Sequence, residues 1–479
     1  MTAGIFETLI SDLDKWRSGK KTAANVLFFG YNCSVMKITV KNFGPIREAK
    51  DICISPLTMF VGPSNTGKTY LAMASRAAIE AASVRYFVAA VSANKLKVND
   101  IWVRKYFDKW LRSAQDMWKK RIVYYLGEEG ENILKSRNVS VTISSDDGSI
   151  VIDLCQPKKS RIRPTRFKSL VANAKKTSPY LSDATRPSTH PELGGWVSLS
   201  LTDEVSSLLC GNLRQRIYCL PAVRGGIMTS YRLIADQSIR SAAEFDAESG
   251  NVSPMFSGVF SDCARQLIGI SKNGRGGKEI IAINKILESD ILHGRINVIF
   301  PDIGLPEFRY VMKGKKSDMA INNVSASVAE LAPLSVFMRY YLKQNDFLIF
   351  EEPETNLHPQ GQRDIADVMV RLANAGVFVL ATTHSDIVLE QISNAVHAAD
   401  IKEKKPKAKI KLLGKNGQNG ALLERKDVVA YSFVKQVQGG TEVRKLPFVG
   451  AAGFVPKEHI KISEALYDET VELYSQKNS

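Results

Sequence analysis

The sequence contains no apolar run long enough to cross a membrane as a helix. Such a helix needs about 20 consecutive, mostly apolar residues, and charged residues interrupt every apolar stretch of this 479-residue chain before that length. The first residues also lack the basic segment followed by an apolar core that marks a secretory signal. We therefore expect no membrane partner and a cytoplasmic protein.

Cysteine and histidine are scarce and scattered. The chain has six of each, and the cysteines show no paired spacing of the kind that holds structural zinc. We expect buried, reduced thiols and no zinc site. An internal repeat and sustained heptads are missing too, which excludes long coiled-coil arms. The cysteines are Cys33, Cys53, Cys155, Cys210, Cys219 and Cys263.

Acidic residues are outnumbered by basic ones. The 65 Lys and Arg against 49 Asp and Glu give a net charge of +16. Basic residues cluster at 158–168, 272–278, 313–316 and 402–411. Each cluster alone is typical of a solvated loop, whereas four together also favour a nucleic acid or another acidic partner. Aromatic residues do not alternate with them, so no base-stacking platform is predicted.

A glycine-containing loop stands between a predicted strand and an Ala-rich helix. It reads "GPSNTGKT" and matches the phosphate-loop pattern G-x-x-x-x-G-K-[ST] in full. Its backbone N–H groups are expected to wrap a polyphosphate, with the lysine at the β- and γ-phosphates and the last hydroxyl at Mg²⁺. The candidate binding residues are Gly62, Pro63, Ser64, Asn65, Thr66, Gly67, Lys68 and Thr69.

A second apolar run ends abruptly in two carboxylates. The stretch "FLIFEEPE" predicts a strand buried in a parallel sheet, with Glu351 and Glu352 at its carboxyl end. Ligands bind outside the carboxyl ends of such strands. One carboxylate is expected to hold Mg²⁺ and the other to orient and deprotonate water. A solvated helix start would explain the pair alone, but the phosphate loop favours a nucleotide site.

Two further segments fit the same site. The apolar strand in "VLATTHS" ends at His384, which we expect to contact the γ-phosphate or hold the attacking water, although a capping histidine is the alternative. The stretch "SASVAEL" opens a helix with small residues, Ser325 and Ser327 among them. Its free N–H groups suit phosphate oxygens, while ordinary serine capping is the simpler explanation.

Together these motifs resemble a known family. "MKITVKNFGPIREAKDICISPLTMFVGPSNTGKTYLA", "ASVAELAPL", "LIFEEPETNLHPQ" and "ATTHS" are similar, in that order, to the ABC-type ATPase heads of the SMC, RecF and OLD superfamily. More narrowly, the chain resembles stand-alone prokaryotic "AAA family ATPase" proteins with an E-E-P-E-x-x-L-H-P motif. The resemblance implies an α/β P-loop NTPase fold with a mixed sheet, an antiparallel β subdomain and a helical lobe.

The resemblance also implies roles for the matching residues. ATP and Mg²⁺ are the implied cofactors, with Glu351 and Thr69 at the metal, Glu352 as general base and His384 as switch histidine. Residues 356–358 correspond to the D-loop. The helix that begins near Ser325 corresponds to the signature helix, which acts in trans in this family. The resemblance therefore implies an ATP-sandwiched homodimer or higher oligomer.

Some positions depart from the family pattern. Ser327 stands where a glycine is usual, and its side chain would crowd the N–H groups that meet the γ-phosphate. The Q-loop glutamine has only Gln115 and Gln156 as candidates, and Arg224 matches a recurring Pro-x-x-Arg without an assigned role. The segment after His384 lacks the D-x-D pair of Toprim nucleases, so nuclease activity is not expected.

The pattern predicts five segments. Residues 1–35 form an extension with an amphipathic helix, and residues 36–100 form a first ATPase lobe with the phosphate loop. Residues 101–295 form an insertion and helical region, with a hairpin that turns at Asp147-Gly148 and a basic loop at 156–195. Residues 296–400 form a second ATPase lobe, and residues 401–479 form a β/α tail.

Three functions remain open from the sequence. The leading hypothesis is an ATPase that dimerises on ATP and gates a partner protein. The family resemblance implies that this partner is an effector encoded nearby and that the two act in anti-phage defence. The second is a RecF-like DNA-binding repair or recombination ATPase, which the basic clusters favour. The third is a nucleotide switch with little hydrolysis, which Ser327 suggests.

Overall fold

The computed structural model describes most of the chain from residue 36 onward. The described residues are 36–83, 100–136, 138–177, 205–206, 209, 216–243, 257–302, 304–407, 420–456 and 465–474. The amphipathic helix expected within 1–35 and part of the loop expected at 156–195 lie outside them. Within the described residues, no helix is both long and apolar enough to cross a membrane.

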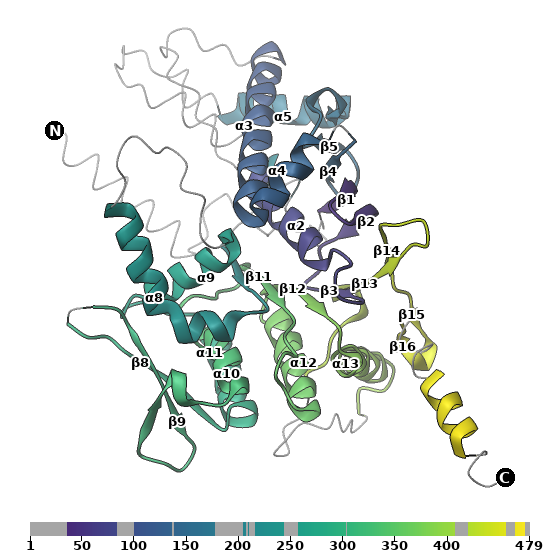
Figure 1. Ribbon diagram of the computed structural model, residues 1–479. Coiled ribbons are helices and arrows are strands. Elements are labelled where there is room, and N and C mark those ends of the chain that lie inside the picture. The colour runs from purple at the N-terminus through teal and green to yellow at the C-terminus, as the bar shows by residue number, and fades with distance from the viewer. Residues whose placement is uncertain are drawn as a thin grey trace. The chain divides into compact units, whose positions relative to one another are not determined.

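One large mixed sheet carries the fold. Its strand order is β6-β5-β4-β1-β2-β14-β13-β3-β12-β11-β7 (Figure 1). The strands are β1 (Lys37–Phe43), β2 (Ile46–Cys53), β3 (Leu57–Val61), β4 (Ser140–Ser144), β5 (Ile150–Asp153), β6 (Arg161–Ile162), β7 (Ile217–Leu220), β11 (Phe347–Glu351), β12 (Phe378–Thr383), β13 (Val428–Lys435) and β14 (Thr441–Lys445).

Five strands of this sheet run in the same direction. β7, β11, β12, β3 and β13 pair in parallel, and every residue of β3 and β11 is buried. Continuous apolar strands of this kind are those of a sheet covered on both faces. The remaining part, from β2 to β6, is joined by antiparallel pairs. The α/β fold class expected from the sequence is confirmed.

Helices cover the two faces of the sheet. They are α2 (Lys68–Ala82), α3 (Asp100–Leu126), α4 (Glu128–Lys135), α5 (Pro164–Thr177), α8 (Arg224–Ala243), α9 (Gly258–Ile268), α10 (Lys278–Ile286), α11 (Ala326–Tyr340), α12 (Pro359–Asn374) and α13 (Asp386–Lys404). Residues of α8, α11, α12 and α13 form one buried apolar cluster, and residues of α2 and α3 form a second.

The two clusters are separated by the sheet itself. Leu348 and Phe350 of β11 belong to the first cluster, whereas Phe347 and Ile349 belong to the second. This alternation follows from the period of two along a strand. The core therefore has three layers, with the sheet between two sets of helices.

The described chain also contains shorter elements, and residues 465–474 are helical. A separate sheet contains β8 (Gly294–Ile299), β9 (Glu307–Met312) and β10 (Asp318–Ala320), and a small pair contains β15 (Phe448–Val449) and β16 (Gly453–Phe454). Single turns are η3 (Pro157–Lys159), η4 (Leu287–Ile291), η5 (Ile321–Asn323), η7 (Arg425–Asp427) and η8 (Gly450–Ala452).

The C-terminal strands enter the middle of the large sheet. β13 pairs with β3 in parallel, and β14 pairs with β2. The hydroxyl of Tyr431 accepts a hydrogen bond of 2.7 Å from the backbone N–H of Cys53. The strand that leads into the phosphate loop is thus flanked by a strand about 370 residues later in the chain.

One expected element is confirmed and one is wrong. The hairpin of β4 and β5 turns at Asp147 and Gly148. In contrast, residues 157–177 do not form the expected loop, because η3, β6 and α5 occupy them. Pro164 begins α5, a position that suits its fixed φ. Leu170 and Val171 are buried, so the helix has an apolar side that its basic composition concealed.

Candidate functional site

The phosphate-loop residues connect the end of β3 to the start of α2. Gly62 and Gly67 have φ values of 149° and 93°, and Asn65 has a φ of 59°. A Cβ at Gly67 would lie 2.9 Å from the side chains of Pro45 and Ile46. Glycine is therefore required by both the backbone and the space. No side chain caps the start of α2, which leaves its N–H groups for an anion.

Lys68 faces the loop that precedes it. Its Nζ donates hydrogen bonds of 2.7 Å to the carbonyl oxygens of Gly62 and Pro63. Burial lowers the pKa of Lys68 to about 8, while the charges of Glu352 and Glu354 act to raise it. Such an ammonium gains a strong partner when a phosphate oxygen comes within reach.

The other loop residues divide into structural and exposed ones. The hydroxyl of Thr66 is held by the carbonyl oxygen of Pro63 at 2.8 Å. Ser64, Asn65 and Thr69 are exposed. Exposed polar groups around a curved backbone suit a ligand that binds from solvent.

Glu351 ends β11 and is buried. Its Oε2 accepts a hydrogen bond of 3.3 Å from the backbone N–H of Ala222, and its carboxylate lies near Thr69. Its Oε1 is buried and has no hydrogen-bond partner among the described residues. Burial raises the pKa of Glu351. An unsatisfied carboxylate oxygen beside a hydroxyl provides the hard oxygen ligands that Mg²⁺ prefers, so these residues fit the metal.

Glu352 adopts a backbone conformation that is unusual for its residue type. Its φ is 44°, and its N–H donates to the carbonyl oxygen of Thr382 at 2.9 Å. Its Oε1 lies 3.1 Å from Nε2 of His384. This hydrogen bond lowers the pKa of Glu352, with further help from the charge of Lys68. An ionised carboxylate held by a histidine at a strand end can accept a proton from water.

The third acid of the same stretch, Glu354, holds the chain segment that carries His384. Its Oε1 accepts hydrogen bonds from the hydroxyl of Thr383 at 2.8 Å and from the N–H of His384 at 2.7 Å. Sequence reasoning gave Glu354 no role. The sequence did contain a clue to this role. Once Glu351 is assigned to the metal and Glu352 to the water, a third carboxylate three residues after Glu351 needs another explanation.

The start of α11 lies apart from this group. Ser325 is exposed, and its hydroxyl lies 3.0 Å from that of Ser327. Ser325 occupies the N-cap position of α11 and makes no capping hydrogen bond through its side chain, so the alternative of ordinary serine capping is not observed there. No hydrogen bond between described residues joins either serine to the phosphate loop.

Three residues singled out in the sequence lie outside the group of carboxylates. Gln115 is buried in α3, where its Nε2 donates to the carbonyl oxygen of Asp153 at 2.9 Å. Gln156 follows β5 and donates its backbone N–H to Asp153 at 2.7 Å. Both bind Asp153 of β5, in the antiparallel part of the sheet. Arg224 is fully buried and contacts the backbone of Glu351 and Glu352 rather than the loop.

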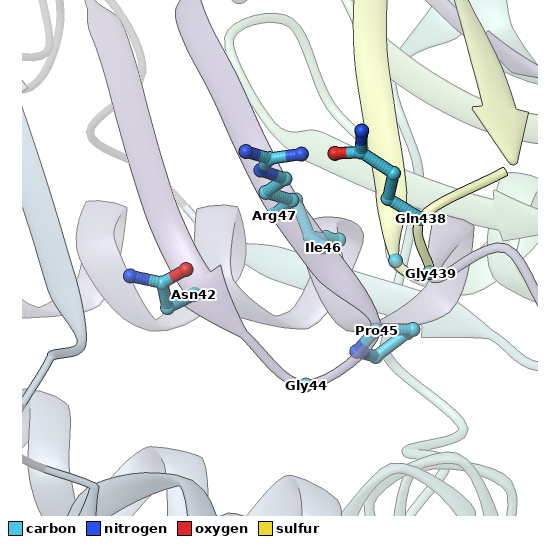
Figure 2. A pocket seen from close by; sticks show the side chains of 8 residues that line it. Asn42, Gly44, Pro45, Ile46, Arg47, Gln438 and Gly439 are labelled. Atoms are coloured by element: carbon cyan, nitrogen blue, oxygen red, sulfur yellow. The ribbon is translucent and has the colours of Figure 1, made fainter. Parts of the chain in front are cut away.

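An open depression lies at the same edge of the sheet. β2 and β14 run opposite to β3, so their starts lie beside the carboxyl ends of the parallel strands. The depression has a volume of about 440 Å³. Figure 2 shows Arg47 and Gln438 extending from neighbouring segments around it. It is lined by Asn42, Gly44, Pro45, Ile46, Arg47, Gln438, Gly439 and Gly440.

Comparison with known proteins gives one family match. Residues 253–389 match the model of the AAA ATPase domain. The matched range contains α11, Glu351, Glu352 and His384, and the phosphate loop precedes it. No curated protein matched the chain.

Solved structures of SMC heads are similar at low identity. An SMC head bound to the C-winged helix domain of ScpA has 13% identity and a TM-score of 0.35, covering 86% of this chain and 97% of that one. The Thermotoga maritima head has 10% identity and a TM-score of 0.32, covering 86% and 99%. A Pyrococcus furiosus head with an extended coiled coil, bound to the C-terminal domain of ScpA, has 12% identity and a TM-score of 0.31, covering 91% and 99%.

The role of Glu354 can be tested by local hydrogen exchange. Replacing Glu354 with Ala should speed amide exchange at residues 382–386 and lower the unfolding free energy by about 1.5–3 kcal/mol, because two donors lose a charged acceptor. Glu354→Gln keeps a carbonyl oxygen at the same place and should retain most of the protection. Equal exchange in the two variants, measured by mass spectrometry, would contradict this role.

Proposed function

We propose that this protein binds ATP with Mg²⁺ and hydrolyses it. The proposal is carried by three features that meet at one edge of the sheet. They are the phosphate loop with the uncapped start of α2, the buried carboxylate of Glu351 with its unsatisfied oxygen, and the Glu352–His384 pair. The match of residues 253–389 to the AAA ATPase domain supports it.

Each side chain then has a separate task. Lys68 exchanges its bonds to Gly62 and Pro63 for phosphate oxygens. Thr69 and Glu351 hold Mg²⁺, which supplies charge neutralisation at the phosphates when bound. Glu352 accepts the proton of the attacking water, and His384, which is bonded to its Oε1, orients that carboxylate.

The start of α11 supplies the reason for a second copy. Ser325 is exposed, and among the described residues no hydrogen bond joins Ser325 or Ser327 to the phosphate loop of the same chain. In our proposal, this uncapped helix end meets the nucleotide held by a partner copy, so that ATP joins two chains. The Ser325–Ser327 contact would have to open for this, since both hydroxyls crowd the helix end.

Gating of an effector in anti-phage defence is proposed from the family resemblance. In this scheme, ATP turnover opens and closes the dimer and thereby releases a bound effector protein. Deletion of the gene in its own host should abolish phage resistance, and a strain that keeps full resistance would argue against the role in defence.

The ATPase proposal is tested with two substitutions in the full chain. Glu352→Gln should lower hydrolysis at least about 100-fold, the usual minimum for loss of a general base, while ATP-bound dimers accumulate. Lys68→Ala should abolish both ATP binding and dimers. Phosphate release and mass in solution are the measurements.

Two outcomes would change the conclusion. A wild-type chain that dimerises on ATP and hydrolyses no more than Glu352→Gln would identify the nucleotide switch with little hydrolysis. A wild-type chain that binds no ATP with Mg²⁺ would reject the proposal altogether.

We further propose that the nucleoside end of ATP occupies the depression lined by the turn between β1 and β2 and the turn between β13 and β14. Pro45 and Ile46 line it and also pack against Gly67 of the phosphate loop. The depression therefore adjoins the end of the loop, where the chain of phosphates would lead. Asn42, Arg47 and Gln438 offer polar groups to a base or ribose.

Filling the depression should distinguish binding of the nucleoside from binding of the phosphates. Gln438→Trp should weaken ATP binding about tenfold, equal to about 1.4 kcal/mol, and leave the binding of inorganic tripolyphosphate unchanged. Val437→Trp is the matched control, because Val437 is fully exposed beside the depression without lining it. Equal affinity for ATP in both variants, by calorimetry, would place the nucleoside elsewhere.

Nucleic acid binding is a second candidate function that one surface favours. Residues 154–177 contain no Asp or Glu and form η3, β6 and α5. Arg104 of α3 lies over the ring of Phe167 in α5, 4.7 Å from its centroid, so the two helices share this face. Five basic residues are exposed there and form no ion pair within the described residues: Lys158, Lys159, Arg161, Arg163 and Lys168.

Charge reversal distinguishes DNA binding by this surface from binding through the positive charge of the whole protein. Replacing Lys158, Lys159, Arg161 and Arg163 by Glu should weaken DNA binding, and should flatten its salt dependence by about 0.9 in log–log slope for each phosphate that is no longer neutralised. Reversal of Lys313, Lys315 and Lys316 near β9 is the control. The absence of binding at low salt, or an equal effect of both reversals, would exclude this surface.

A further inference from the structure

A charged side chain is buried directly behind the two glutamates. Arg224 begins α8, and its side chain has no exposed surface. A guanidinium buried without partners would cost several kcal/mol. The groups that satisfy it therefore show what it holds in place.

Arg224 binds the backbone on which the two glutamates stand. Its Nη1 donates to the carbonyl oxygen of Glu351 at 2.7 Å, and its Nη2 donates to that of Glu352 at 3.1 Å. The guanidinium also lies over the ring of Phe350, 4.9 Å from its centroid. Because Glu352 has a φ of 44°, which L-residues adopt at a cost, its position depends on such external contacts.

The same guanidinium reaches α11. Its Nε donates to the carbonyl oxygen of Glu330 at 3.0 Å and lies 3.6 Å from Oε2 of that residue. Glu330 stands one turn after Ser327, on the helix whose start is exposed. One buried cation thus joins α11 to the carboxyl end of β11.

The carboxylate of Glu330 extends this connection. Its Oε2 accepts from the N–H of Gly225 at 3.2 Å, and its Oε1 accepts from Nδ2 of Asn356 at 3.4 Å. Asn356 lies in the turn that follows the glutamates. Glu330 therefore contacts both the start of α8 and the segment after β11, and a shift of α11 must displace all three.

We propose that Arg224 and Glu330 are positioning residues that couple two events. Through them, docking of α11 on a second copy and alignment of Glu351 and Glu352 occur together. The proposal rests on the proposed ATPase function and adds its regulation. A dimer in which α11 is displaced would bind ATP and fail to align the carboxylates of its own chain.

Two adjacent glycines provide a matched test. A Cβ at Gly225 would lie 2.6 Å from Oε1 of Glu330, whereas a Cβ at Gly226 would meet no atom within 4 Å. Neither glycine has a positive φ, so alanine fits the backbone at both. Gly225→Ala therefore displaces the Glu330 carboxylate without removing a charge, and Gly226→Ala is the control.

The expected result is a loss of turnover without a loss of binding. Gly225→Ala should lower kcat about 10- to 100-fold, since a misplacement on the order of 1 Å has effects of this size. The Kd for a fluorescent ATP analogue and the melting temperature should stay close to those of Gly226→Ala. ATP-bound dimers should still form, and kcat should no longer rise with protein concentration.

A second pair of variants guards against misfolding. Arg224→Lys keeps the charge but cannot reach both carbonyl oxygens and Glu330 together, so it should reproduce the loss of kcat. Arg232→Lys is its control, because Arg232 of α8 pairs with Glu307 at 2.8 Å on the surface and should tolerate the change. Arg224→Lys combined with Glu330→Gln should cost no more than either alone, as expected of one unit.

Failure of the inference differs from failure of the proposed function. If the wild type hydrolyses ATP and Gly225→Ala retains its kcat within about twofold, the inference is wrong and the proposed function stands. A joint fall of kcat, affinity and melting temperature in Gly225→Ala would also overturn the inference. If the wild type hydrolyses no ATP, Mn²⁺ affinity in the ADP complex, measured by electron paramagnetic resonance, decides instead. Weaker Mn²⁺ binding in Gly225→Ala than in Gly226→Ala supports positioning, and equal binding rejects it.

Discussion

Parallel pairing of β3, β12 and β11 is the constraint on which the candidate site depends. Val61 of β3 pairs with Thr383 of β12, and Thr382 pairs with Glu351 of β11. This register brings the phosphate loop, the histidine strand and the two glutamates to one edge of the sheet. The N–H of Gly62 even donates to the carbonyl oxygen of Thr383 at 3.4 Å, so the loop begins against the residue that precedes His384. A shift by one residue would turn these side chains to opposite faces.

The environments of the two glutamates explain how neighbours can differ in role. Glu351 points into the protein, where burial raises its pKa and leaves one oxygen unsatisfied. Glu352 is partly exposed, and its hydrogen bond to His384 lowers its pKa. Two carboxylates whose pKa values move apart are suited to different tasks. The positive φ of Glu352 produces this divergence, because it turns the chain immediately after the strand.

Buried cations hold the rest of the arrangement. Lys68 covers the carbonyl oxygens of its own loop, and Arg224 covers those of the glutamates. Both are satisfied mainly by backbone oxygens, so the cations fix main-chain geometry in addition to balancing charge. This distinguishes the site from a cluster of surface ion pairs, which contribute little to structure.

The sequence by itself determined the α/β class, the phosphate loop and the strand that delivers Glu351 and Glu352. These features are local, since glycine spacing and continuous apolar runs report backbone conformation within a few residues. Only the tertiary structure decided the contacts of Arg224, Glu330 and Glu354, because the hydrogen bonds of Arg224 span 106 and 127 residues of chain. It also placed β13 and β14 between β3 and β2 and folded residues 164–177 into a helix. Burial and pairing between distant segments depend on where the chain returns to the sheet. The local periodicity of the sequence does not specify that position.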